Sequence, residues 1–184
     1  MTKQRGFTLV ELMIVIAIVA VLSTLAIVYM SPQTKAIDVA TRFGDMVSEA
    51  SRLAAQYGPV RADVAAAHGT ERTYIEATTA GPRPKFTLYL RVEHAEPSNA
   101  IDEVEIQSYD MDDEAKRVTA ESFANSVGKY ADVTPISDWD QFSIKCYSNG
   151  TCEPRTLYFS QATGSSKDRK ARVSVMPLGA AIYV

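Results

Sequence analysis

Residues 7–30 read FTLVELMIVIAIVAVLSTLAIVYM, and Glu11 is the single charged residue among these 24. A helix of that length measures about 36 Å at 1.5 Å per residue, and the hydrocarbon core of a bilayer is about 30 Å thick. The stretch therefore predicts a helix that spans a membrane.

The residues on either side of this run predict its orientation. Met1 to Gly6 precede it, with Lys3 and Arg5 as their only charges. Basic flanks stay on the cytoplasmic side, so residues 31–184 are predicted to be exported. A secretory signal peptide is the alternative. However, the apolar region of a signal peptide is shorter than residues 7–30, and residues 27–30 offer no small-residue cleavage site.

Glu11 is the unusual residue of the run, because a carboxylate inside an apolar span costs about 3 kcal/mol and usually has a function. A simple membrane anchor, the other alternative, gives no reason for this residue. Glu11 follows Phe7 by four residues, on the same helical face. It therefore lies close to the amine that a cut before Phe7 would create.

The stretch from Arg5 to Val15, RGFTLVELMIV, resembles the amino-terminal signal of type IV prepilins and of the pseudopilins of type II secretion. The resemblance covers the first 30 or so residues. It implies cleavage after Gly6 by prepilin peptidase and methylation of the new Phe7 amine. It also implies that the Glu11 carboxylate pairs with the amine of a neighbouring subunit during assembly.

Residues 172–179, RVSVMPLG, are similar to the end of minor pilins and pseudopilins of the GspH/FimT type, in which two strands flank a Pro-Leu-Gly turn. Many pilins also carry a proline near the distal end of the span. Here Pro32 lies just past it, where it either begins a new helical turn capped by Ser31 or marks a break.

The segment after the apolar run has the periodicity of an amphipathic helix. Between Thr34 and Tyr57, apolar residues recur at intervals of three and four, and Gly58-Pro59 ends or bends the helix. We expect this stripe to pack against a sheet of the same chain. Its members are Ile37, Ala40, Phe43, Val47, Ala50, Leu53 and Tyr57.

The rest of the chain is predicted to be rich in β-strands. Residues 60–85 give mixed signals, with helix favoured at 65–67, strand at 73–75 and a turn at 81–84. After Pro84 apolar residues alternate with polar ones, and a short helix is predicted over 115–129. The candidate strands cover 86–92, 104–106, 141–147, 155–160, 172–176 and 180–184.

These patterns predict an α+β fold, in which a long N-terminal helix packs on a C-terminal antiparallel β-sheet or sandwich. The first half of the helix would cross the membrane, and the second half would be amphipathic. The predicted boundaries are a cleaved leader 1–6, a transmembrane and filament-core helix 7–30, its amphipathic continuation 31–58 and an extracytoplasmic head 59–184.

Cys146 and Cys152 are the only cysteines, and an exported segment favours a disulfide over free thiols. Asn149-Gly150 is a signal for a two-residue hairpin loop, but a strict hairpin there would pair Cys146 with Glu153. A disulfide therefore needs a wider five-residue loop or a bulge. The cysteines have no nearby histidine, so no zinc site is predicted.

Two charged clusters stand out in the predicted head. The acidic cluster, Asp110, Asp112, Asp113 and Glu114, has the oxygen ligands that calcium prefers but lacks the glycine and distal glutamate of an EF-hand. We interpret it as a solvated turn, with calcium as the alternative.

The basic cluster contains Lys167, Arg169, Lys170 and Arg172, which could contact the phosphates of DNA. DNA capture is a role of some FimT-like subunits. However, 19 basic side chains less Lys3 and Arg5 leaves 17 against 22 acidic ones. We therefore favour a solvated hairpin tip over a DNA contact.

Composition and motifs point away from catalysis. Apolar residues make up 46% and charged residues 22% of the 184, which is ordinary for a globular chain and excludes extensive disorder or a polytopic membrane protein. His68 and His94 stand apart from any serine, cysteine or acidic arrangement typical of an active site. No enzyme activity and no cofactor are predicted.

The sequence thus predicts a minor subunit of a type IV pilus, anchored in the bacterial inner membrane with its head in the periplasm and later assembled into a filament. The expected partners are other pilins or pseudopilins, prepilin peptidase, the membrane and an inner-membrane assembly platform. A pseudopilin of a type II secretion system and a DNA-binding minor pilin for DNA uptake remain as alternatives.

Overall fold

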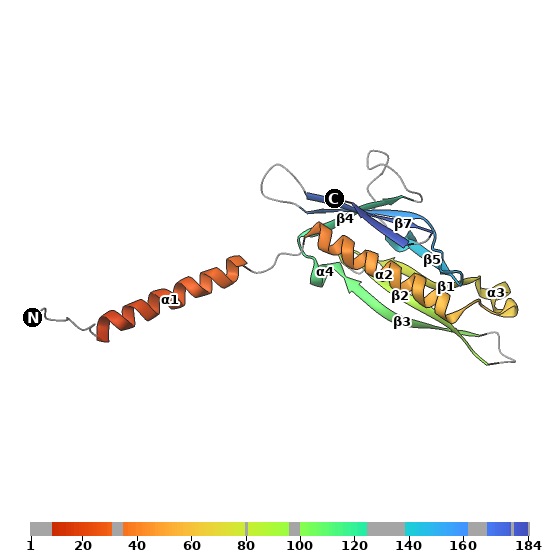
Figure 1. Cartoon of the computed structure of the whole chain (residues 1–184), viewed down its shortest axis with the longest axis horizontal. Coiled ribbons are helices and arrows are strands. Elements are labelled where there is room, and N and C mark those ends of the chain that lie inside the picture. Colours follow the sequence, from red (N-terminus) through yellow and green to blue (C-terminus); the bar gives the residue numbers. More distant parts are fainter. Residues whose placement is uncertain are drawn as a thin grey trace, which may run out of the picture. The chain divides into compact units, whose positions relative to one another are not determined.

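The chain forms two compact units, Met1–Gln33 and Thr34–Val184, and we call the second the head. The computed structural model describes residues 9–30, 35–79, 81–95, 100–124, 139–161, 169–177 and 179–183. Helix α1, Leu9–Met30, belongs to the first unit (Figure 1). The alternatives for Pro32 fall outside the described residues.

The head begins with helix α2, Ala36–Tyr57, in the stretch whose periodicity predicts a helix. The other elements are α3 Ala62–His68, β1 Glu71–Thr78, β2 Lys85–Glu93, β3 Ile101–Asp110, α4 Met111–Glu114, β4 Val118–Ala124, the 3-10 turn η2 Trp139–Gln141, β5 Ser143–Tyr147, β6 Arg155–Gln161, β7 Arg169–Met176 and β8 Gly179–Tyr183. The class is α+β, as predicted.

The strands form two antiparallel four-stranded sheets. The first has the order β3-β2-β1-β5 and the second the order β4-β6-β7-β8. Helix α2 contacts strands of both sheets and lies along them (Figure 1). A sandwich of two sheets packed face to face is therefore not confirmed, because the helix supplies the surface that both sheets cover.

Phe43 of α2 lies at the centre of the core. Its ring centroid is 5.0 Å from that of Phe86 in the first sheet and 6.4 Å from that of Phe159 in the second sheet. The centroid of Phe142, which precedes β5, is 6.2 Å away. All four side chains are almost completely buried. The core cluster draws its members from Ala36 to Val175, so the head has a hydrophobic core of its own.

Both ends of α2 are held by polar contacts. At the start, the backbone N–H of Lys35 donates to the Asp38 carboxylate at 2.8 Å, which caps the helix. At the end, Gly58 has a φ of 70°, a left-handed conformation that favours glycine. The buried Arg72 guanidinium donates to the Gly58 carbonyl at 3.0 Å and the Pro59 carbonyl at 2.6 Å, which satisfies carbonyls where the helix ends.

Two sequence expectations are wrong. The short helix over 115–129 is not formed in its described part, because Val118–Ala124 is strand β4, which pairs with β6. The buried Val118 shows the reason, since its side chain joins the core. Tyr57, assigned to the buried stripe of α2, is the last residue of the helix and is 50% exposed.

We predict that Phe43→Ala lowers the free energy of unfolding of the head by about 3–5 kcal/mol, because it leaves a cavity between the two sheets. Urea denaturation of residues 34–184, followed by circular dichroism, measures this change. Thr41→Ala, at an exposed position of the same helix, is the matched control and should change stability by about 0.5 kcal/mol or less. A loss below 1 kcal/mol for Phe43→Ala would contradict the placement of this ring.

Candidate functional site

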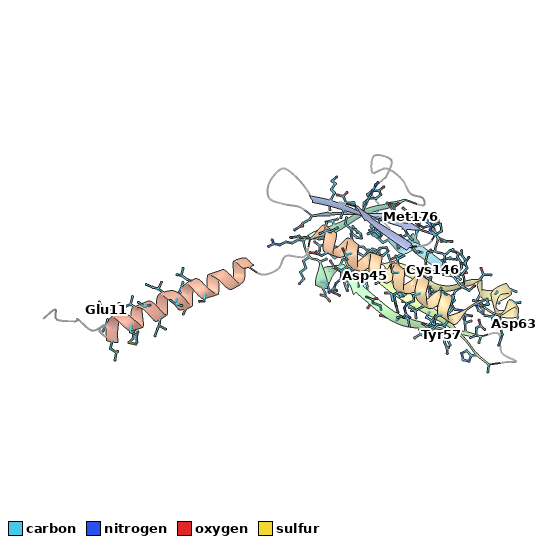
Figure 2. The ribbon with its side chains drawn as sticks, viewed as in Figure 1. Glu11, Asp45, Tyr57, Asp63, Cys146 and Met176 are labelled. Carbon is cyan, nitrogen blue, oxygen red and sulfur yellow. A yellow bond between two sulfur atoms is a disulfide. The ribbon has the colours of Figure 1, made fainter. Side chains whose placement is uncertain are left out.

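Glu11 lies in the first turn of α1, near the amino-terminal end of the helix (Figure 2). The unpaired backbone N–H groups of a helix start carry partial positive charge, so a carboxylate is favoured there. Lys3, Arg5, Gly6 and Phe7 lie outside the described residues. The processing site and the new amine that the sequence predicts therefore stay predictions.

Helix α1 presents apolar side chains on every side. From Leu9 to Leu22 its large apolar residues are exposed, for example Leu9 at 75% and Ile18 at 53%. A helix that is apolar all round is normally buried in a membrane or among other helices. Within the described residues, no helix is long and apolar enough to cross a membrane, so the span over 7–30 is not confirmed.

Cys146 and Cys152 form a disulfide, as the sequence favours. The two cysteines face each other as an isolated antiparallel bridge, with five residues between them. The backbone N–H of Tyr147 donates to the Thr151 carbonyl at 2.8 Å, and Gly150 has a left-handed φ of 78°. The loop is thus the wider one that the sequence requires for a disulfide.

The disulfide loop contacts both α2 and the second sheet. The Ser51 hydroxyl of α2 donates to the Gly150 carbonyl at 2.6 Å. The backbone N–H of Cys152 donates to the Pro177 carbonyl at 3.1 Å, in the turn between β7 and β8. Figure 2 shows Cys146 in the part of the head where α2 and β5 lie. This loop therefore links the first sheet, the helix and the second sheet.

The turn containing Pro177 is the one that the sequence assigns to residues 172–179. Strands β7 and β8 flank it, and Met176 pairs with Gly179 across it. The two strands predicted on either side of Pro177 are thus present and pair with each other.

The acidic cluster is engaged with arginines and with its own backbone. The Asp110 carboxylate accepts from the Asp112 backbone N–H at 2.9 Å and caps α4. Asp112 pairs with Arg83 at 3.1 Å, and Glu114 pairs with Arg42 of α2. Across the described ranges, no group of three metal-ligating side chains comes together. These contacts are those of a turn that joins β3 to the core.

The basic cluster lies at the start of β7. Lys167 is outside the described residues, and the side chain of Arg169 is not described. Lys170 is exposed and Arg172 is half-buried. In the register between β7 and β6 they lie opposite Ser160 and Tyr158, respectively. The structure brings Lys170 and Arg172 to one face of the second sheet, and DNA contact stays a prediction.

The two histidines are placed separately. His68 ends α3, and the Nε2 atom of His94 lies 3.0 Å from the Asp102 carboxylate near the start of β3. Neither belongs to a described cluster with a nucleophile.

Residues 1–27 match the model of a protein family described as the prokaryotic N-terminal methylation motif. This chain carries a type IV prepilin signal. The match covers the leader, Glu11 and most of α1, and it supports a pilin-like or pseudopilin substrate of prepilin peptidase that assembles with other pilins. No curated protein and no solved structure matches the chain.

The head also contains a network of ion pairs that the sequence did not reveal. Glu71 of β1 is buried, and its Oε1 atom lies 2.9 Å from Arg91 of β2 and 3.0 Å from Lys145 of β5. Burial opposes ionisation of Glu71, but its own backbone N–H, Lys145 and Arg91 hold the pKa of the carboxyl below its usual value. The network ties the three strands together on one face.

We predict that removing the disulfide with paired Cys146→Ser and Cys152→Ser changes lowers the free energy of unfolding of the head by about 2 kcal/mol. The reason is that closing so short a loop removes a modest amount of unfolded-chain entropy. Thermal melts of the head with and without reductant measure the effect. Reductant should destabilise the native head and leave the double variant unchanged. An equal response of both proteins would contradict this prediction.

We predict that Glu71→Gln lowers the free energy of unfolding by about 2 kcal/mol at neutral pH, because Arg91 and Lys145 lose a charged acceptor. The pKa of Glu71 is depressed in the folded state, so its contribution is present above the unfolded pKa and lost as pH falls through the folded one. Urea titrations at neutral and acidic pH should therefore show the difference shrinking as pH falls. Asp45→Asn, the same kind of change on the exposed side of α2, is the matched control.

Proposed function

We propose that the protein is a minor subunit of a type IV pilus, assembled through α1 after prepilin peptidase cuts behind Gly6 and the Phe7 amine is methylated. The observation that carries the proposal is the prepilin signal over residues 1–27, which runs into an apolar helix followed by a head with its own core. The subunit acts in pilus priming or at the tip.

The chemistry of the signal supports this mechanism. Cleavage leaves a cationic amine at Phe7, four residues before the Glu11 carboxylate. Both charges are costly in an apolar environment, and pairing between neighbouring subunits offsets that cost. The pair forms when the amine of one helix is level with the carboxylate of the next, so it also sets the axial register of the subunits.

The apolar surface of α1 supports assembly from the membrane. Before assembly the helix anchors the chain in the bacterial inner membrane with the head in the periplasm. Moving from lipid into a bundle of similar helices keeps its exposed apolar side chains in apolar surroundings. Extraction by the assembly platform therefore does not require α1 to enter water.

The choice of a minor pilus subunit has a narrower basis. The turn at Pro177 between β7 and β8 supports the resemblance to GspH/FimT-type subunits. Minor pseudopilins share that resemblance, so a type II secretion pseudopilus is the alternative to a pilus.

We predict that Gly6→Asp blocks processing, because the peptidase then meets a charged side chain at the bond it must cut. Glu11→Ala should allow processing but reduce assembly at least tenfold, because the Phe7 amine loses its counter-charge. Immunoblots of membranes separate precursor from mature chain, and the yield of the subunit in sheared surface pili measures assembly.

Asp45→Ala in the head is the control for Glu11→Ala and should leave both readouts unchanged. Normal maturation of Gly6→Asp would overturn the proposal. If a strain with the gene deleted keeps its pili but loses secretion, the subunit belongs to a secretion pseudopilus. If the strain loses its pili and complementation restores them, the subunit belongs to the pilus.

A further inference from the structure

The outer edge of the first sheet is formed by β3, a strand of ten residues. Residues 102–108 are all exposed, so neither face of this part of the strand is covered. On one side β3 pairs with β2, and within the described chain no strand pairs with its other side (Figure 1). Such an edge presents backbone N–H and C=O groups that can accept a further strand.

The side chains of β3 are both apolar and acidic. Val104 and Ile106 are 43% and 40% exposed, which is unusual for large apolar residues of a sheet. Val104 pairs with the buried Leu90, so it lies on the face that turns toward α2. Glu103 and Glu105 lie on the opposite face, where their register partners on β2 are Arg91 and Tyr89.

The charged residues of the strand are all acidic. Its sequence, IDEVEIQSYD, contains four carboxylates and no cation. Asp102 pairs with His94 and Glu103 pairs with Arg91, whereas Glu105 has no cation within ion-pair distance among the described residues. Two copies joined edge to edge through β3 would bring carboxylates together, and like charges in an interface are strongly disfavoured. The charge therefore disfavours pairing of β3 with a second copy of itself and favours pairing with a basic strand.

We propose that β3 is a docking edge for a basic β-strand presented by a different neighbouring subunit, which would extend the sheet beyond β3. Backbone hydrogen bonds would supply affinity, Val104 would meet an apolar side chain, and Glu103 and Glu105 would meet lysine or arginine. The inference deepens the proposed function, because a filament places different subunits next to one another.

The test uses the head, residues 34–184, and three synthetic peptides of the same length as β3. The first alternates lysine with valine, the second has glutamate in place of lysine, and the third is the lysine peptide with all of its backbone nitrogens methylated. The third keeps the charge but cannot form a regular ladder. Binding at low ionic strength is measured by fluorescence anisotropy, and protection of β3 amides by hydrogen exchange.

We expect the lysine peptide to bind and to protect amides of β3, and the glutamate and N-methylated peptides to bind at least about tenfold more weakly. Glu105→Lys should weaken binding of the lysine peptide by about tenfold. Asp45→Lys makes the same charge change on the exposed side of α2 and should leave binding unchanged. Thermal melts establish that both variants are folded.

Equal binding of the lysine peptide and its N-methylated form would show ionic attraction alone and would overturn the proposal. Failure of the lysine peptide to bind, or a failure of Glu105→Lys to weaken it, would do the same. These outcomes do not depend on processing at Gly6, so they leave the pilus assignment standing. Conversely, normal maturation of Gly6→Asp would overturn that assignment and leave the strand-docking result intact.

Discussion

The burial of one side of α2 against two sheets is the contact on which the head depends. Strands of both sheets contact the helix, and the Phe43 ring lies beside aromatic residues from both. A helix usually buries one stripe and leaves the rest to water. Here the buried residues include both Val39 and Ala40, and both Met46 and Val47, so the buried surface is broad. Without α2, apolar surface of both sheets would be exposed to water, and the stability that comes from its burial would be lost.

The polar contacts of the head follow from this arrangement, because two sheets that share a helix must be held to it along its length. Near the start of α2, Arg42 pairs with Glu114 and lies over the Tyr109 ring. In the second half of the helix, the Thr73 hydroxyl donates to the Ala50 carbonyl at 2.8 Å inside the core. Toward the end, Ser51 holds the disulfide loop, which in turn reaches the β7–β8 turn. Loop, helix and both sheets thus form one connected unit.

Local patterns in the sequence predicted most of this fold, and the failures lie where distant residues decide. The stripe of α2 and the alternation of β2 are visible within a few residues. The error over 115–129 arose because helix-forming residues at its start are followed by Val118, whose burial depends on pairing with β6 some forty residues later. The spacing of the cysteines did not decide between the two loops. A two-residue Asn-Gly loop needs a positive φ at both residues, and of the two only Gly150 has one. The Glu71–Arg91–Lys145 network needed the register of three strands, which no local pattern contains. The prepilin signal, in contrast, is entirely local, and the sequence alone was enough to identify it.

The two units of the chain differ in the selectivity that their surfaces can provide. The side chains of α1 are apolar on every side, and apolar helices pack with many partners because dispersion forces carry little directional information. In the proposed assembly Glu11 sets the register along the helix axis, but every subunit with the same signal shares that feature. A filament that places a particular subunit at a particular position therefore needs discrimination from the heads. An edge strand whose charged residues are all acidic would supply it, since backbone pairing fixes geometry and like charges reject wrong neighbours. In the proposed assembly, α1 decides that the subunit joins a filament, and β3 decides which neighbour it joins.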